Sequence, residues 1–583
     1  MIKTFLTIIF TAAFLICHFQ PYPASGNFAA LAQTQGVKIS EVKMVNGTPR
    51  LFINSEEIDT GAVNIYYLPD MGVSVEGKNE VPRYASEKWL TNTKDLIDQA
   101  LSNHARLILL NLWWSDLDKS VIRANSISAY LDFNNLDKIF DYAGKQGAYI
   151  IPVFVFFPFI PDWWLKENNF PPYNKAKICD FCETDSYGNV YNNPSMNSDK
   201  VQRDWGSFLE GVIKHYKNHP ALAGWMVGVG ATGEDGYGPN YIYLRGFGNA
   251  TEKIENRPLM FTDYSPYFER KFKEWLKEKY GSEAGLQSAR EDKSITFDYF
   301  KIPKPIEMIK GGKQVPVFPD PTDIFALAAG KNSLDNLTVK GLDFYNFRNY
   351  MRRLDRRYYS DLFRKNDPNH ILIFSASSED FLSEESLADG IGFSLAGSID
   401  AEANNLFYYL ALDIVKKAAS HKKLAFISRE HVCDGELRSR IGQCETSEQL
   451  RFTETLGKSV KCAGGIFAYT AAPYDESSFA NGSWVPPVWF SGEIMAVAKK
   501  INEYVPSQGC ACSFTREVYS NSGCDTINAA GNCGLLSKFY GSCCGGMITE
   551  AKFNNPVDTT GKCGDGICDS FERECGKCPA DCK

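Results

Sequence analysis

The sequence predicts an α/β protein: a (β/α)₈ TIM barrel followed by a small disulfide-rich C-terminal region. Eight short apolar segments alternate along the chain with amphipathic segments of helical length. The apolar runs are continuous rather than alternating, which is typical of parallel strands buried on both faces. No Gly-rich phosphate loop follows the first run, and eight strand–helix pairs fit a closed barrel better than an open doubly wound sheet.

The predicted elements follow one another in a regular order. Residues 37–60 predict a β-hairpin with its turn at Asn46-Gly47. The predicted barrel strands are 62–67, 106–112, 149–156, 222–229, 371–375, 390–395, 424–428 and 465–470. The predicted helices between them are 86–103, 136–145, 201–217, 266–280, 343–366, 404–420 and 447–459.

The N-terminus has the pattern of an export signal. Lys3 precedes an apolar run over residues 5–17, and Ala30-Leu31-Ala32 offers a small-x-small cleavage site, with residues 24–26 as a competitor. No second apolar stretch approaches the length of a transmembrane helix. The sequence therefore predicts a protein without a transmembrane segment that is secreted or held at the cell surface.

The sequence predicts that the chain has four parts. Residues 1–32 are the expected signal peptide, and residues 33–504 form the expected barrel, with an irregular insertion over 282–342. Residues 505–560 are a Cys-rich region, and residues 561–583 are a small Cys/Asp-rich module. Of the 17 cysteines, eleven lie between Cys510 and Cys582, which in an exported chain indicates a disulfide-stapled tail.

The charge of the chain argues against nucleic acid as a partner. The formal net charge is −8, and no block of lysines and arginines supplies the concentrated basic surface that phosphate binding needs. Aromatic residues make up 13% of the chain, which suits stacking on sugar rings but equally suits a large core. Composition alone leaves those two readings open.

Two glutamates follow predicted strands whose ends face each other across the barrel. Glu234 lies just past the fourth strand, flanked by glycines, and Glu430 comes directly after the seventh. TIM-barrel active sites are built at the C-terminal ends of the strands. Glycoside hydrolysis needs one protonated and one ionised carboxyl group, so this pair predicts catalysis at a glycosidic bond. The alternative is structural: each glutamate caps a helix or pairs with a nearby cation such as Arg429.

Several segments resemble family 42 glycoside hydrolases, the β-galactosidase-type barrels of clan A. The similar segments are IPDWWL at 160–165, TDSYGN at 184–189, HYKNHPALAGW at 215–225 and the helix over 266–280. Residues 45–500 can be laid on a barrel of this kind. The resemblance implies that Glu234 is the acid/base, that Glu430 is the nucleophile, and that configuration is retained.

One departure from that family bears on the mechanism. Clan A barrels place Asn directly before the strand-four Glu, whereas this chain has Gly233 there. The Gly-rich segment is also similar to the one that carries the acid in inverting, β-amylase-like barrels. Two alternatives therefore stand beside a retaining hydrolase: an inverting amylase-like enzyme, and a non-catalytic carbohydrate-binding barrel at the cell surface. Asp235 is the substitute candidate for the acid.

Polar and aromatic residues near the strand ends are candidates for substrate binding. An amide there could hydrogen-bond a sugar hydroxyl, and aromatic rings could stack on a sugar face, although core packing accounts equally well for about half of the aromatics. His431 could tune the carboxyl beside it or simply occupy the loop. The candidates are Asn111, Trp113, Trp114, Trp163, Asp235, His431, Tyr469 and Trp484.

The final module gathers acidic side chains in a segment too small for a core of its own. Hard oxygen ligands so close together suit Ca²⁺, whereas the alternative is a disulfide knot with solvated acids. The module is expected to attach the enzyme to a surface rather than to take part in catalysis, which needs no cofactor. The resemblance also makes a homo-oligomer an expectation. The candidate calcium ligands are Asp565, Asp569, Glu572 and Asp581.

Overall fold

The computed structural model describes most of a barrel and a helical segment beside it. Both predicted catalytic glutamates, Asp235, His431, Trp484 and the whole tail lie outside the described part of the chain. Each of the two described cysteines, Cys182 and Cys462, takes part in a disulfide bond. The described residues are 39–58, 61–65, 87–119, 121–123, 126–128, 131–155, 160–170, 180–184, 188, 190–195, 197–228, 263–304, 307–308, 310, 337–375, 387–395, 411, 414–429, 447–471 and 492–506.

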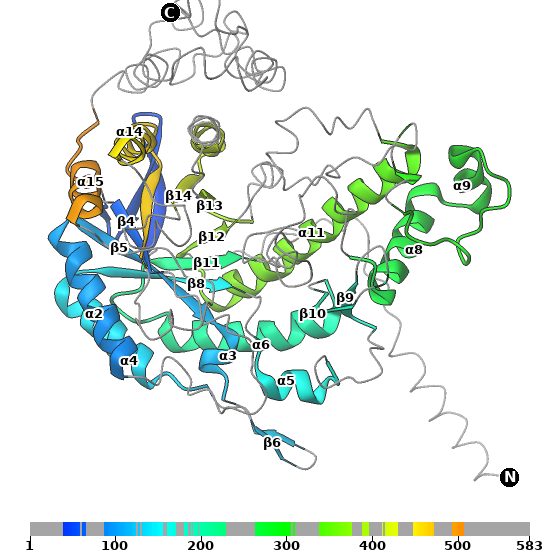
Figure 1. The fold of residues 1–583 in the computed structure, drawn as a ribbon, viewed down its shortest axis with the longest axis horizontal. Helices are drawn as coiled ribbons and strands as arrows, with labels where there is room; N and C mark the ends of the chain where they lie inside the picture. The colour runs from blue at the N-terminus through cyan, green and yellow to red at the C-terminus, as the bar shows by residue number, and fades with distance from the viewer. Residues whose placement is uncertain are drawn as a thin grey trace, which may run out of the picture. The chain divides into compact units, whose positions relative to one another are not determined.

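Eight parallel strands close into a barrel, as the sequence predicts (Figure 1). Each strand pairs with its neighbours in chain order, and the last pairs with the first through Ala468 and Ala62. Every predicted strand is present within about two residues of its expected bounds. In order they are β4 (Gly61–Ile65), β5 (Ala105–Trp113), β8 (Tyr149–Val155), β11 (Gly224–Gly228), β12 (Ile371–Ser375), β13 (Gly390–Leu395), β14 (Leu424–Arg429) and β15 (Ile466–Ala471).

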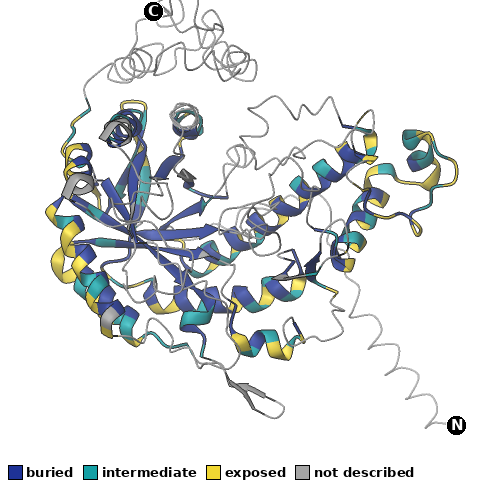
Figure 2. Ribbon diagram, in the orientation of Figure 1, coloured by how far each residue is buried: buried dark blue, intermediate teal, exposed yellow. Residues whose placement is uncertain are grey.

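Amphipathic helices cover the outside of the barrel, with buried inner faces and exposed outer faces (Figure 2). In α6, for example, Trp205, Leu209 and Val212 are buried at helical spacing while the opposite face is charged. No helix in the described ranges is both long and apolar enough to cross a membrane. The covering helices are α2 (Glu87–Ser102), α4 (Asn134–Gln146), α6 (Asp199–Tyr216), α11 (Val339–Asn366), α14 (Ser447–Cys462) and α15 (Gly492–Asn502).

The strand register shows which side chains point into the barrel. Side chains alternate along a strand, and residues paired between parallel strands share a face. Phe154 contacts Trp225 and Phe363, with ring centroids 6.0 and 5.9 Å apart, so these strand residues face the helices. Met226 faces inward, because a Cβ on Gly392, two strands away, would lie only 3.0 Å from its Cε. These contacts define the inward face of all the strands in register with them.

A hairpin packs against the N-terminal end of the barrel. β1 (Ser40–Val45) and β2 (Thr48–Ile53) pair antiparallel, with Asn46 and Gly47 at φ 51° and 79° in the turn between them. Positive φ at both central residues is what a two-residue type I′ turn requires, which explains the Asn-Gly pair. Ser40 Oγ accepts a hydrogen bond from the Ile371 backbone N–H at the start of β12, 2.9 Å away. A short strand, β3 (Glu56–Glu57), extends this sheet.

Short elements occupy the connections that follow the second and third strands. They add a short helix after β5, another after β8 and two small antiparallel strand pairs, and none of them extends the barrel itself. These elements are α3 (Trp114–Leu117), β6 (Val121–Arg123), β7 (Ser126–Ser128), α5 (Asp162–Glu167), β9 (Cys182–Thr184) and β10 (Val190–Pro194).

The prediction that residues 282–342 form an irregular insertion is wrong at both ends of that stretch. Helix α9 (Glu283–Arg290) begins it, and α11 already starts at Val339. The Ser282 side chain caps α9 by accepting a hydrogen bond from Gly285 N–H, which is an ordinary role for serine at the start of a helix. With α8 (Pro266–Tyr280), these helices build a second hydrophobic core, separate from that of the barrel, around Phe268, Phe272, Leu286, Phe344 and Phe347.

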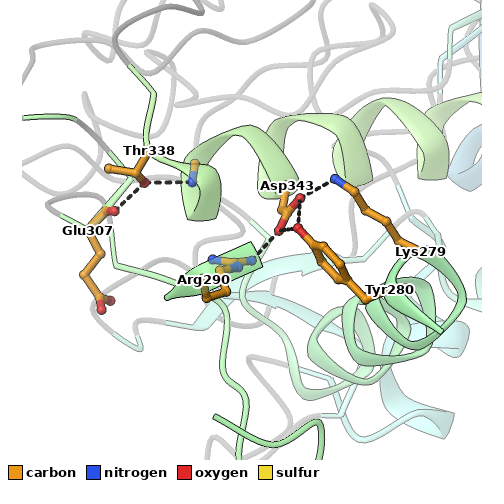
Figure 3. Close-up of polar contacts among 7 residues, drawn as sticks. Lys279, Tyr280, Arg290, Glu307, Thr338 and Asp343 are labelled. Carbon is orange, nitrogen blue, oxygen red and sulfur yellow. Dashed lines mark hydrogen bonds and ion pairs between the residues drawn. The ribbon is translucent and has the colours of Figure 1, made fainter. Parts of the chain in front are cut away.

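A buried charge cluster ties the three helices of this second core together (Figure 3). Asp343 of α11 forms ion pairs with Lys279 and Arg290, and Tyr280 Oη donates to its Oδ2 at 2.9 Å. Asp343 and Arg290 are each 1% exposed. Burial and the Asp343 carboxylate raise the pKa of Tyr280 to about 12, so its hydroxyl stays a donor at neutral pH. Beside the cluster, Thr338 caps α11 by accepting from Gly341 N–H at 3.1 Å.

Asp367 caps the C-terminal end of α11 and links it to strand β11. Its Oδ2 accepts hydrogen bonds from Trp225 Nε1 and from His370 Nδ1, both at 2.8 Å. Burial raises the pKa of the carboxyl. The interactions with His370 and the hydrogen bonds from Trp225 and the Asn369 backbone N–H together outweigh burial, so the pKa lies below its ordinary value. A lowered pKa means that the stabilisation is present above the unfolded value of about 3.9 and is lost as pH falls through the folded value.

Asp367→Asn is therefore expected to lower the free energy of unfolding most at neutral pH. The difference between wild type and variant should narrow as the pH falls below about 4, because the wild-type carboxyl then becomes protonated. Urea unfolding at pH 7, 4 and 3 measures this difference. A difference that stays constant over this range would show that the charge of Asp367 does not contribute.

Candidate active site

Polar side chains line the inside of the barrel at the C-terminal ends of four strands. Asn64 on β4, Asn111 on β5, Ser375 on β12 and Ser428 on β14 occupy inward-facing positions in the strand register. We refer to these four residues as the polar belt. The inward positions nearer the N-terminal end are apolar, among them Leu109, Ile151, Met226, Ile373 and Phe426. The interior thus becomes polar at the end where barrel active sites lie.

Three residues of the polar belt are joined by hydrogen bonds. Asn111 Nδ2 donates to Asn64 Oδ1 at 2.8 Å and to the Ile65 carbonyl oxygen at 3.2 Å. Asn64 Nδ2 donates in turn to Ser428 Oγ at 3.2 Å. Asn64, Asn111 and Ser428 are 8%, 3% and 8% exposed. Buried amides without hydrogen bonds are costly, so this chain explains how a polar layer is accommodated inside the barrel.

Sequence reasoning found one member of the polar belt and missed three. Asn111 was predicted from its place near the end of the second strand, whereas Asn64, Ser375 and Ser428 were not singled out. The signal was present, because each is a polar residue within or just at the end of an apolar strand: VNI, IFS and FIS. A polar residue within a strand buried on both faces is a better marker of the polar layer inside the barrel than the aromatic residues that follow the strand.

The neighbouring tryptophans Trp113 and Trp114 occupy different surroundings. Trp113 ends β5 on the same face as Asn111 and is fully buried. Trp114 begins α3 and is 1% exposed, with its indole N–H donating to Asp118 Oδ2 at 2.9 Å. Its ring packs on Trp164 and Phe208, with centroids 5.8 and 6.2 Å away. Trp114 is thus part of the hydrophobic core, and we do not propose sugar stacking for it.

Trp163 and Tyr469 also differ in what they can contact. Trp163 is half-buried on α5, its ring edge-on to Trp114 at 6.4 Å, and its buried indole nitrogen lacks a hydrogen-bond partner among the described residues. Tyr469 pairs with Val63 and Arg429 in the register, on the face of β15 opposite the polar belt. Its ring packs edge-on against Phe467. Trp163 therefore stays a candidate for binding substrate, whereas the contacts of Tyr469 are those of the layer between strands and helices.

Because their surroundings differ, substitution of Trp114 is expected to affect stability, whereas substitution of Trp163 is expected to affect substrate binding. Trp114→Phe leaves the Asp118 carboxylate without its indole donor, so the free energy of unfolding is expected to fall by about 1–3 kcal/mol with little change in ligand binding. Trp163→Ala is expected to weaken binding of the substrate. Thermal unfolding and KM for both variants, measured side by side, check this. A raised KM for Trp114→Phe with unchanged stability would contradict the assignment.

A buried carboxylate joins the connections that follow strands three and four. Asp263 accepts hydrogen bonds from Ser265 N and Oγ, at 2.7 and 2.9 Å, and from Thr184 N at 3.3 Å. Burial raises the pKa of Asp263, whereas these hydrogen bonds and one from Ser195 act in the opposite direction. Because Ser265 also caps α8 through Phe268 N–H, Asp263 fixes the start of that helix against β9. We assign Asp263 a structural role.

Glu234, Asp235, Glu430, His431 and Trp484 lie outside the described residues, as do all four predicted calcium ligands in the tail. In the part of the chain that is described, no three His, Cys, Asp or Glu side chains group as metal ligands do.

The barrel shows a distant structural similarity to β-galactosidases of family 42 and to β-amylases. A β-galactosidase from Halorubrum lacusprofundi is 14% identical with a TM-score of 0.45, and one from Bacillus circulans sp. alkalophilus is 13% identical with a TM-score of 0.46. They match 76% and 71% of this chain, which spans only 57% and 50% of theirs. The catalytic domain of a Paenibacillus polymyxa β-amylase is 12% identical, with a TM-score of 0.48, over 76% of this chain and 97% of that domain.

No protein-family model matches the chain, and no curated protein matches its sequence. At the identities and TM-scores above, the structural likenesses are too distant to assign an activity. The strand register establishes the barrel. The polar belt marks the C-terminal end of the barrel as the candidate site.

Proposed function

We propose that this chain is a glycoside hydrolase that cleaves a glycosidic bond with two carboxyl groups, Glu234 and Glu430. The observation that carries the proposal is the polar belt at the C-terminal end of a closed barrel, above described inward positions that are apolar nearer the N-terminal end. Amide and hydroxyl groups are suitable partners for the hydroxyl groups of a sugar. Both glutamates follow strands that end at this belt, Glu234 six residues after β11 and Glu430 directly after β14.

The order of the strands supports the pairing of these two residues. β11 and β14 are separated by two strands on one side of the ring and four on the other, so their ends lie across the barrel from each other. Ser428 faces inward, and alternation gives the residue two positions further along a continuing strand the same orientation. That residue is Glu430. A carboxylate from strand seven would thereby meet the acid from strand four on either side of a bound sugar.

In the proposed mechanism the two glutamates have different protonation states. Glu234 donates its proton to the leaving oxygen, while ionised Glu430 attacks the anomeric carbon and forms a glycosyl-enzyme. Water then hydrolyses this intermediate with Glu234 acting as base, and configuration is retained. In this mechanism, mutual repulsion between the two carboxyl groups is expected to raise the pKa of the acid. The expected substrate is a β-galactoside or a related glycoside, and the expected place of action is outside the cell.

A panel of aryl glycosides, β-galactosides foremost, tests the proposal, with wild type and Glu430→Gln assayed together. Turnover by wild type that disappears in the variant would support a glycosidase and identify its sugar. The anomer first released, followed by NMR, separates retention from inversion. Sugar binding without hydrolysis of any aryl glycoside or polysaccharide would instead favour the carbohydrate-binding barrel, for which Gly233 is the motivating departure.

A further inference from the structure

The hydrogen-bond chain Asn111–Asn64–Ser428 has a defined direction. The Ile65 carbonyl oxygen only accepts, so the atom of Asn111 that faces it, 3.2 Å away, is the amide nitrogen. The same nitrogen donates to Asn64 Oδ1, which turns the Asn64 amide nitrogen toward Ser428 Oγ. The Ser428 oxygen is therefore the acceptor. The direction of all three hydrogen bonds follows from the Ile65 main-chain carbonyl at the end of β4, which can only accept.

The hydrogen bond between Asn64 and Ser428 connects two strands that are not neighbours in the barrel. β15 separates β4 from β14 in the ring, so the bond from Asn64 to Ser428 crosses β15 on the inside of the barrel. Ala468 lies at the crossing, paired with Ser428 on one side and with Ala62 on the other. Its side chain is only a methyl group and is fully buried. A larger residue at this position would separate the two polar side chains.

The crossing holds the end of strand seven just before the proposed nucleophile. Ser428 and Glu430 are two residues apart, or about 7 Å along an extended strand. Catalytic groups must be held to about 0.5 Å, and a displacement near 1 Å can cost about 100-fold in rate. Main-chain pairing with β13 and β15 holds β14 within the plane of the sheet. The hydrogen bond from the Asn64 amide adds a contact to β14 from inside the barrel.

We propose that Asn64 is a positioning residue for catalysis: through Ser428 it sets the place of the strand-seven carboxylate, with Asn111 orienting the Asn64 amide. This inference rests on the proposed function. It assigns to the first strand a role in a reaction whose carboxylates come from strands four and seven.

The test measures kcat and KM on the aryl glycoside that wild type hydrolyses, for Asn64→Ala, Ser428→Ala and the double variant. Each single substitution is expected to lower kcat about 10- to 100-fold while KM stays within about threefold. The double variant is expected to be no slower than the slower single variant, because both remove the same link. Ser428→Thr keeps the hydroxyl and is expected to restore most of kcat.

Val63→Ala and Ile427→Ala are the matched controls, since both are buried on the same strands and face away from the belt. They are expected to lower the melting temperature with kcat within about threefold of wild type. If Asn64→Ala does not fold, Ser428→Ala alone decides, because it removes a single oxygen atom.

Unchanged kcat in folded Ser428→Ala, or losses that multiply in the double variant, would overturn the inference. Failure of the proposed function gives a different result, namely no hydrolysis by wild type or full activity in Glu430→Gln. Wild-type turnover that Glu430→Gln abolishes, together with a fully active Ser428→Ala, would contradict the role of Asn64 alone.

Discussion

Glu430→Gln is expected to lower kcat for an aryl glycoside by about 10⁴-fold or more, with the fold intact. Glutamine has nearly the shape of glutamate but cannot attack the anomeric carbon, so the covalent step is lost. The loss should be similar for good and poor leaving groups, because no substituent on the substrate replaces the nucleophile. Steady-state kinetics on a series of aryl glycosides, with circular dichroism as the check on folding, measures this.

Glu234→Gln is expected to behave differently on the same series. General acid catalysis contributes about 10²–10⁴-fold, and a leaving group that is already a weak base needs little protonation. The loss should therefore be large for a poor leaving group and small for an activated one. Glu210→Gln on α6 is the control, because Glu210 is a half-buried glutamate on the outside of the barrel, paired with Lys214 at 2.6 Å. Full activity in either Glu430→Gln or Glu234→Gln would contradict the assignment of that residue.

The largest expected effect on stability comes from Asp343→Ala. The substitution leaves the buried Arg290 guanidinium without its carboxylate and also removes the acceptor of Tyr280 Oη. Breaking a buried ion pair by removing one partner costs about 3–5 kcal/mol, because an uncompensated charge stays in the interior. Chemical unfolding should show a lower free energy of unfolding, and hydrogen exchange should locate the loss in α8, α9 and the first half of α11.

An exposed pair in the same part of the chain provides the control. Lys277 and Asp298 lie 3.7 Å apart with side chains 54% and 85% exposed, so Asp298→Ala is expected to change stability by less than about 0.5 kcal/mol. Equal losses from Asp343→Ala and Asp298→Ala would show that the cluster in Figure 3 does not hold the second core together.

The sequence by itself determined the barrel and the order of its elements. A strand buried on both faces must be apolar throughout, and a helix that covers a barrel must be apolar on one side, so both patterns are set by the nearest residues in the chain. The strand at 371–375 and the helix at 266–280 match their predicted bounds at both ends. The turn at Asn46-Gly47 was equally readable, because its positive φ values depend on those two residues alone.

Only the tertiary structure decided which side chains meet. Trp113 and Trp114 are adjacent and alike in sequence, yet one ends a strand beside Asn111 and the other is hydrogen-bonded to Asp118. Asn64 and Ser428 are 364 residues apart and come together through the register of strands closed into a ring. The second core likewise depends on α8, α9 and α11 packing together. Local periodicity reports that a residue is buried, whereas its partner is chosen by packing between distant segments.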